Sequence, residues 1–278
     1  MTPKYSIRSS RRERVAAQYG SAQSANEYAD AYQDSRAVGR FLRARLRLVQ
    51  DILASCPGGD LLDAGCGPGI MAQALLKSRP HDFRINVLDQ SRAMVEYCAT
   101  SARSLGTVYP AVGQLEALPY ADGTFDVTLV MGVLEYANVC AAFNELSRVT
   151  RPGGLVVVTM HNPLCLYRVT EWILYRPIFR VLGAVEICLH VPVERRHKTG
   201  APGIHGFGPG KLRRLMTQAD LEPVDLVYFD LTLPIPPFYG PAKAGSRERT
   251  AYERKGTARW SRRLCRGYLV AARPGFRN

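Results

Sequence analysis

The sequence predicts a doubly wound α/β fold, in which helices cover both faces of a largely parallel sheet. The stretch LLDAGCGPG at 61–69 reads as a buried strand that runs into a glycine-rich turn. A helical stretch follows at 70–79 and ends at Pro80. Strand and helix patterns then alternate as far as Met160, which is typical of βα units. The apolar run at 125–131 suits a strand that is buried on both faces.

The other elements before Met160 follow from periodicity and turn residues. Residues 1–25 are predicted to form an arm with a short helix at 11–19. Apolar residues recur at helical spacing over 36–53 and predict a helix there. RPGG at 151–154 predicts a tight turn into the next strand. We also expect strands at 85–88, 108–112 and 155–160, and helices at 91–105 and 140–149.

Beyond Met160 the pattern is less regular. An apolar helix that carries arginines is predicted over 164–182, with a kink at Pro177. A loop-rich insert is expected at 185–210. The rest of the chain predicts a helix at 209–219, a strand at 224–233, a basic helix at 246–263 and a final strand at 267–272.

The spacing of the glycines indicates which ligand this turn binds. A dinucleotide-binding turn needs a third glycine where this chain has Ile70. The chain instead has G-x-G-x-G preceded by Asp63. About twenty residues beyond the turn, the next strand ends in Asp89, which is placed to accept hydrogen bonds from ribose hydroxyls. The two acids suit an adenosyl ligand that carries a sulfonium and an amino-acid tail.

Four blocks occur in the order and at the spacing of a known family. They are LLDAGCGPG, NVLDQS, EALPYADGTFDVTLVMGVLEYA and LSRVTRPGGLVVVT, and they cover 60–159. On these motifs the chain resembles class I S-adenosylmethionine-dependent methyltransferases of the small-molecule branch (methyltransferase type 11), typified by quinone-biosynthesis enzymes. The resemblance implies a Rossmann-like, doubly wound seven-stranded sheet with an antiparallel last strand and a helical cap or insert.

The resemblance also implies the cofactor, S-adenosylmethionine, and its site. The glycine turn would contact the adenosyl and methionine portions, the acid after the second strand the ribose, and the segment before the LP dipeptide the adenine. The family usually has an acid where this chain has Gln114, so the adenine amino group would meet an amide oxygen, which also accepts a hydrogen bond. The implied cofactor-binding residues are Asp63, Gly65, Cys66, Gly67, Gly69, Asp89, Gln90, Gln114, Leu115, Met131 and Gly132.

Four regions follow from the same resemblance. Residues 1–35 would form the N-terminal arm and cap helices, and 36–160 the Rossmann-like core that binds S-adenosylmethionine. Residues 161–210 would form a cap or insert on the substrate side, and 211–278 would complete the core sheet.

The composition of the chain limits its domain organisation, the state of its cysteines and the compartment in which we expect it. Its 278 residues suit one domain with a cap. Its seven cysteines show neither C-x-x-C pairs nor metal-ligand spacing, so we expect reduced core thiols, no metal and a cytoplasmic protein. No signal peptide or membrane-spanning stretch is recognised. The net charge of +13 gathers in three basic clusters, which are either a solvated surface or a contact for nucleic acid, an anionic membrane or a phosphorylated substrate.

Candidate catalytic and substrate residues lie around the predicted active edge. His161 follows the fifth strand and His205 lies in the insert, and either could remove a proton from a hydroxyl or amine acceptor, although a structural histidine is an equally good interpretation. If the acceptor is carbon, aromatic faces could stabilise the cation. The candidate substrate-binding residues are Tyr19, Tyr28, Tyr32, Tyr136, Trp172 and Phe207.

Other functions are weighed against this hypothesis. A nucleic-acid adenine methyltransferase would show N/D-P-P-Y where this chain has GVLEYAN, and a cytosine enzyme would need a Pro-Cys pair, so nucleic acid is disfavoured. We expect a methyltransferase that tailors a hydrophobic or aromatic metabolite by O-, N- or C-methylation, as in natural-product biosynthesis. The alternatives are a membrane-associated lipid or polyprenyl-quinone methyltransferase, and a non-catalytic cofactor-binding protein. The N-terminal arm could mediate homo-oligomer formation.

Overall fold

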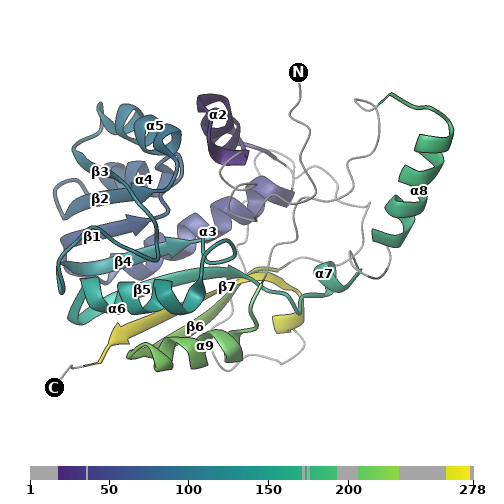
Figure 1. Ribbon diagram of the computed structural model, residues 1–278. Coiled ribbons are helices and arrows are strands. Elements are labelled where there is room, and N and C mark those ends of the chain that lie inside the picture. Colours follow the sequence, from purple (N-terminus) through teal and green to yellow (C-terminus); the bar gives the residue numbers. More distant parts are fainter. Residues whose placement is uncertain are drawn as a thin grey trace.

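The computed structural model describes residues 18–35, 37–170, 173, 176–192, 206–231 and 261–275. A seven-stranded sheet forms its centre, in the order β3-β2-β1-β4-β5-β7-β6 (Figure 1). The strands are β1 (Gly59–Ala64), β2 (Phe83–Asp89), β3 (Val108–Val112), β4 (Phe125–Met131), β5 (Thr150–His161), β6 (Leu221–Leu231) and β7 (Cys265–Pro274).

The direction of the strands confirms the predicted fold class. Strands β1 to β5 pair in parallel, whereas β7 lies between β5 and β6 and is antiparallel to both. Because the carboxyl ends of parallel strands share one edge, the residues after β1, β2, β4 and β5 come together there. The sheet is thus the seven-stranded, doubly wound sheet with an antiparallel last strand that the motifs implied.

Helices cover both faces of the sheet, as predicted. Neighbouring strand residues point to opposite faces, so Leu61 packs with α3 to α5 and Leu62 packs with α6 and α9. Both leucines are fully buried. The helices on the two faces are α3 (Ala37–Ala54), α4 (Ile70–Ser78), α5 (Arg92–Ala102), α6 (Val139–Val149) and α9 (Pro209–Gln218), and α2 (Ala22–Asp30) lies beside α5.

One local prediction needs correction. The RPGG at 151–154 lies inside β5 as a bulge, because Thr150 pairs with Phe125 and Leu155 pairs with Val127. Of the helix predicted over 164–182, the structure describes α7 (Leu166–Thr170) and α8 (Arg176–Cys188), and Pro177 lies in α8. Residues 171–172 and 174–175, between these two elements, lie outside the described residues. Figure 1 shows α8 standing apart from the sheet.

Several predictions fall outside the described residues. These are the arm at 1–17, most of the insert at 193–205 and the basic helix at 246–260, of which only the short η3 (Ser261–Arg263) is described. Within the described part of the chain, no helix combines the length and hydrophobicity needed to cross a bilayer. Cys140 and Cys188 are exposed, so the cysteines are not all core residues.

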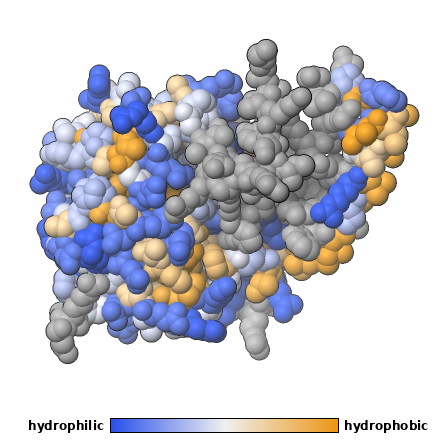
Figure 2. All heavy atoms as spheres, viewed as in Figure 1, coloured by the Kyte–Doolittle hydropathy of each residue, from blue (hydrophilic) through white to orange (hydrophobic). Residues whose placement is uncertain are grey.

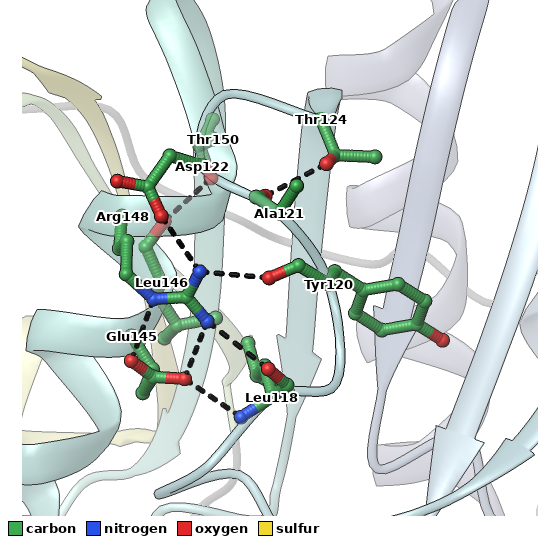
Figure 3. Close-up of polar contacts among 9 residues, drawn as sticks. All are labelled: Leu118, Tyr120, Ala121, Asp122, Thr124, Glu145, Leu146, Arg148 and Thr150. Atoms are coloured by element: carbon green, nitrogen blue, oxygen red, sulfur yellow. Dashed lines mark hydrogen bonds and ion pairs between the residues drawn. The ribbon is translucent and has the colours of Figure 1, made fainter.

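An ion-pair network around the half-buried Arg148 fixes the segment that leads into β4 (Figure 3). The Arg148 guanidinium on α6 donates to the carbonyls of Leu118 and Tyr120 at 3.0 and 2.7 Å. It also binds the Asp122 and Glu145 carboxylates, and Glu145 accepts the Leu118 N–H at 2.7 Å. The hydrogen bonds from Arg148 lower the pKa of Glu145. This network holds in place the segment that directly follows Gln114 and Leu115.

The glycines of the 61–69 turn serve different purposes. All three have positive φ, at 86°, 52° and 76° for Gly65, Gly67 and Gly69. A Cβ on Gly65 would lie 2.2 Å from Val133, and one on Gly69 would lie 2.2 Å from the Cys98 sulfur. A Cβ on Gly67 would meet only the ring of Tyr28, at 3.7 Å. Packing therefore requires Gly65 and Gly69, whereas Gly67 leaves the backbone open toward the cavity.

We predict that Gly69→Ala lowers the free energy of unfolding of the cofactor-free protein by about 2 to 4 kcal/mol, from φ strain plus overlap with Cys98. Gly153→Ala is the matched control, since Gly153 has a φ of 79° and nothing within 4 Å of the added Cβ. The control substitution should lower the free energy of unfolding by the φ strain alone, about 1 to 2 kcal/mol. Chemical denaturation measures both free energies of unfolding. An equal loss of stability in Gly69→Ala and Gly153→Ala would contradict the packing of Gly69 against Cys98.

Candidate active site

One cavity of about 430 Å³ lies at the carboxyl edge of the sheet. The glycine turn after β1, the ends of β2, β4 and β5, and the helices α2 and α3 contribute to its lining. Most residues that the sequence proposed for the site meet here. The ones that line the cavity are Gly65, Cys66, Gly67, Asp89, Gln90, Gln114, Leu115, Met131 and Gly132, together with Tyr19, Tyr28, Tyr32, Tyr136 and His161.

Asp89 is held by backbone donors from both sides. Its Oδ2 accepts the Gly67 N–H at 3.0 Å and its Oδ1 accepts the Ser91 N–H at 2.9 Å. Burial raises the pKa of this carboxyl, while the hydrogen bonds from Ser91, Gly67 and Gln90 oppose the rise. Each carboxylate oxygen has a second lone pair, so Asp89 can also accept two hydroxyl groups from a ligand in the cavity.

Asp63 lies under the turn and not in the cavity lining. It is 1% exposed, and neither of its carboxylate oxygens has a hydrogen-bond partner among the described residues. Burial raises its pKa to about 7, the Asp89 charge adds to the rise, and Arg45 opposes it. An unsatisfied buried acid of this kind suits a cationic ligand above it, because positive charge favours the ionised form. Gly69 also lies outside the lining, since it packs against Cys98.

Four tyrosines line the cavity next to the turn. Tyr19 packs edge-on against Tyr28 and Tyr136, with ring centroids 6.0 and 6.4 Å apart, and Tyr28 packs against Tyr32 at 6.1 Å. The Ser91 hydroxyl donates to the Tyr19 carbonyl at 2.7 Å. The N-terminal segment is thereby fastened to the start of α5, beside Asp89, and its tyrosines form an aromatic wall.

Arg45 is a site residue that the sequence analysis missed. It is buried, and its Nη2 donates to the hydroxyls of Tyr32 and Tyr28 at 3.0 and 3.3 Å. Its Nη1 lies 2.4 Å from where a Cβ on Gly132 would be, so that position must be glycine. The available signal was a charged residue four positions after Phe41, on the apolar face of the predicted helix.

His161 lines the cavity from the end of β5. Its ring stacks on Phe41, with centroids 4.5 Å apart and planes 8° from parallel. Its backbone N–H donates to Oε1 of the buried Glu135 at 3.2 Å. Burial, together with the charges of Arg168, Arg45 and Arg266, lowers the pKa of His161 to about 3. The imidazole is therefore neutral at physiological pH and can accept a hydrogen bond.

Two of the remaining proposed residues are not described by the structure, and a third, Phe207, lies outside the cavity lining. His205 and Trp172 lie outside the described residues. Phe207 is described, but it packs against the core on the α6 and α9 face, with Lys211 5.0 Å from its ring centroid. Its carbonyl accepts the Tyr268 hydroxyl at 2.5 Å. The placement of Phe207 in the substrate site is corrected accordingly.

Comparison with known proteins agrees with this arrangement. Residues 62–158 match the methyltransferase domain family. The chain is 32% identical to the malonyl-[acyl-carrier protein] O-methyltransferase of Dechloromonas aromatica, over 73% of this chain and 66% of the relative. It is 30% identical to the nocamycin O-methyltransferase of Saccharothrix syringae, over 70% of this chain and 71% of that relative. It spans less than two thirds of the length of several other curated relatives that it matches.

A solved structure shows that the fold is shared. The S-adenosylmethionine-dependent methyltransferase structure from Thermotoga maritima superposes with a TM-score of 0.59 at 17% identity, over 91% of this chain and 96% of that one. The four motifs, the sheet order and the family match agree with one another. The chain therefore belongs to the class I S-adenosylmethionine-dependent methyltransferases, the family whose cofactor is S-adenosylmethionine.

Proposed function

We propose that this protein transfers the methyl group of S-adenosylmethionine to a hydrophobic or aromatic small molecule. The observation that carries the proposal is that Asp89, the open backbone at Gly67 and the tyrosine wall line one cavity. Two relatives are named as O-methyltransferases, one of malonyl-[acyl-carrier protein] and one of nocamycin, which supports oxygen as the acceptor atom and a role in specialised metabolism.

The residues present fit the cofactor. Asp89 would accept the ribose hydroxyls, and Gln114 and Leu115 would lie against the adenine. The backbone at Gly65 and Gly67 would approach the adenosyl and methionine portions, with the unpaired Asp63 carboxylate beneath them. S-adenosylmethionine supplies an electrophilic methyl group on a sulfonium.

The protein would act on the acceptor mainly by alignment, since methyl displacement needs the acceptor atom in line with the methyl and the sulfur. Tyr19 and Tyr136, whose rings meet edge to face, line the cavity and would hold a flat or apolar body. The neutral imidazole of His161 would accept the hydrogen bond of an acceptor hydroxyl and so orient its lone pair.

We predict that Asp89→Asn weakens the binding of S-adenosylhomocysteine at least tenfold in calorimetry, which corresponds to about 1.4 kcal/mol. A neutral amide makes weaker hydrogen bonds than a carboxylate and cannot accept from Gly67 and Ser91 at both of its atoms. Asp82→Asn, at a largely exposed carboxylate paired with Arg79, is the control and should bind like the wild type. Equal affinity of Asp89→Asn and the wild type would contradict the proposed site.

Catalysis itself needs a second measurement. Release of S-adenosylhomocysteine in the presence of an acceptor distinguishes an enzyme from a protein that only binds the cofactor. A panel of phenols, carboxylic acids and amines of matched size would show which acceptor atom the site uses, and binding without turnover of any of them would favour the non-catalytic alternative.

We predict that the His161 imidazole does not titrate between pH 5 and 8, because its pKa is lowered to about 3 and the ring stays neutral above that value. The measurement is a histidine NMR titration in which the His161 signal is assigned by its loss in His161→Gln. Free imidazole added to the sample titrates in this range and serves as the reference. A His161 signal that moves with a midpoint near 6.5 would contradict the neutral ring.

A second candidate function is supported by α8. Its exposed apolar residues include Ile178, Val181 and Val185, which are 53%, 66% and 46% exposed, and Arg180 precedes Val181 in the sequence. Figure 2 shows hydrophobic residues gathered on the outer part of the molecule that α8 forms. This pattern favours contact with an anionic membrane surface and a lipid-like acceptor.

We predict that the protein sediments with phosphatidylglycerol vesicles and that the double substitution Val181→Glu with Val185→Glu abolishes this vesicle binding. The control is Val224→Glu on β6, at a residue that is 49% exposed, and it should leave vesicle binding unchanged. Vesicle binding that survives the double substitution would exclude α8 as the membrane contact.

A further inference from the structure

Arg45 is a buried arginine of α3 that lines the cavity with part of its hydrogen-bonding capacity unused. The residue is 4% exposed. Its Nη2 makes both of its hydrogen bonds within the described part of the chain, to the Tyr32 hydroxyl at 3.0 Å and to the Tyr28 hydroxyl at 3.3 Å. Nε is buried and has no hydrogen-bond partner among the residues that the structure describes. Because each nitrogen of a guanidinium carries N–H donors, Arg45 retains donors for a further acceptor.

The partners of Arg45 do not neutralise its charge. A guanidinium stays protonated in proteins, and a buried charge without an ionised partner is costly. Burial raises the pKa of Tyr32 to about 12, so this hydroxyl is neutral at pH 7 and accepts a hydrogen bond without supplying a counter-charge. The charge of Arg45 opposes the rise in the pKa of Asp63 and of Glu135, but neither acid is hydrogen-bonded to it. The described contacts of the guanidinium are the two tyrosine hydroxyls.

Arg45 lies beside the part of the cavity that the cofactor's amino-acid tail would occupy. Its Nη1 lies in the space that a Cβ on Gly132 would fill. Gly132 follows β4 and lines the cavity together with Arg45 and with Gly65 of the glycine turn. Gly132 is also a residue expected beside the cofactor's sulfur, and only a short carbon chain separates that sulfur from the carboxylate of the tail. The guanidinium is therefore within reach of this carboxylate.

We propose, on the basis of the function proposed above, that Arg45 binds the carboxylate of the cofactor's amino-acid tail, and that Tyr28 and Tyr32 position its guanidinium for this contact. The two hydroxyls occupy Nη2 and leave other N–H groups for the ligand. A carboxylate accepts from such donors and also supplies a negative charge, so it binds them more strongly than a neutral acceptor of the same shape. The protein would thus select adenosyl ligands that carry the carboxylate.

The test compares two ligands of one shape, S-adenosylhomocysteine and the same molecule with its carboxylate replaced by a neutral carboxamide. Calorimetry at pH 7 measures the binding of both to the wild type and to each variant, and circular dichroism checks that each variant is folded. We expect the wild type to bind S-adenosylhomocysteine at least tenfold more tightly than the carboxamide. This comparison needs no substitution, so it can refute the proposal even where a variant at the buried Arg45 fails to fold.

The variant Arg45→Gln should bind S-adenosylhomocysteine at least tenfold more weakly and leave the affinity for the carboxamide unchanged, so that the preference for the carboxylate disappears. Arg45→Lys should recover only part of that preference, since it keeps the charge without the planar group of donors. Tyr28→Phe with Tyr32→Phe should reduce the preference without abolishing it, because the charge remains but loses the hydroxyls that position it. Arg47→Gln, at an exposed arginine of the same helix outside the cavity lining, is the matched control and should behave as the wild type.

Equal affinity of the wild type for the two ligands would overturn the proposal, and so would a loss in Arg45→Gln that falls equally on both. Unchanged binding of S-adenosylhomocysteine by folded Arg45→Gln would also overturn it and would leave Arg45 to a carboxylate of the methyl acceptor. A full wild-type preference in the tyrosine double variant would contradict the positioning role of Tyr28 and Tyr32. Failure of the proposed function is a different result, namely no binding of either ligand by the wild type.

Discussion

The structure of the site depends on the carboxylate of Asp89. One of its oxygens accepts the N–H of Gly67 and the other accepts the N–H of Ser91. These two bonds hold the turn after β1 against the end of β2 and the first turn of α5. The Ser91 hydroxyl then binds the carbonyl of Tyr19, so the N-terminal segment that bears the tyrosines is fixed to the same point. A single half-buried acid thus connects the sheet edge, the glycine turn and the aromatic wall.

The cavity brings together charged groups of both signs. Asp89 lines it and Asp63 is buried beneath the glycine turn, while Arg45, Arg168 and Arg266 line it together with His161. Arg45 donates to the hydroxyls of Tyr28 and Tyr32, and its charge lowers both the pKa of Asp63 and the pKa of His161. Charges in a confined space act on a bound ligand more strongly than they would in water.

The fold and the glycine-turn end of the cavity could be predicted because their signals are local. The turn, the acid after β2 and the segment around Gln114 each lie in one short stretch, and the parallel βα pattern brings them to one edge. The strands β3 and β4 have the predicted bounds for the same reason.

The His161 end could not be predicted in this way. The stacking of Phe41 on His161 joins α3 to β5, and Arg266 reaches the same place from β7, so tertiary packing alone brings them together. Phe207 was predicted in the substrate site, but its ring packs on the α6 and α9 face of the sheet. Its position ahead of α9 in the sequence does not show which face its ring packs on. RPGG was misplaced because its glycines serve a bulge as readily as a turn.

The most direct test of this account is a crystal structure of the protein with S-adenosylhomocysteine. The account predicts that the ribose hydroxyls lie within hydrogen-bond distance of the Asp89 carboxylate, that the purine lies beside Gln114 and Leu115, and that the sulfur lies next to Gly132. A ligand bound at another place, or one whose ribose faces away from Asp89, would contradict the central claim.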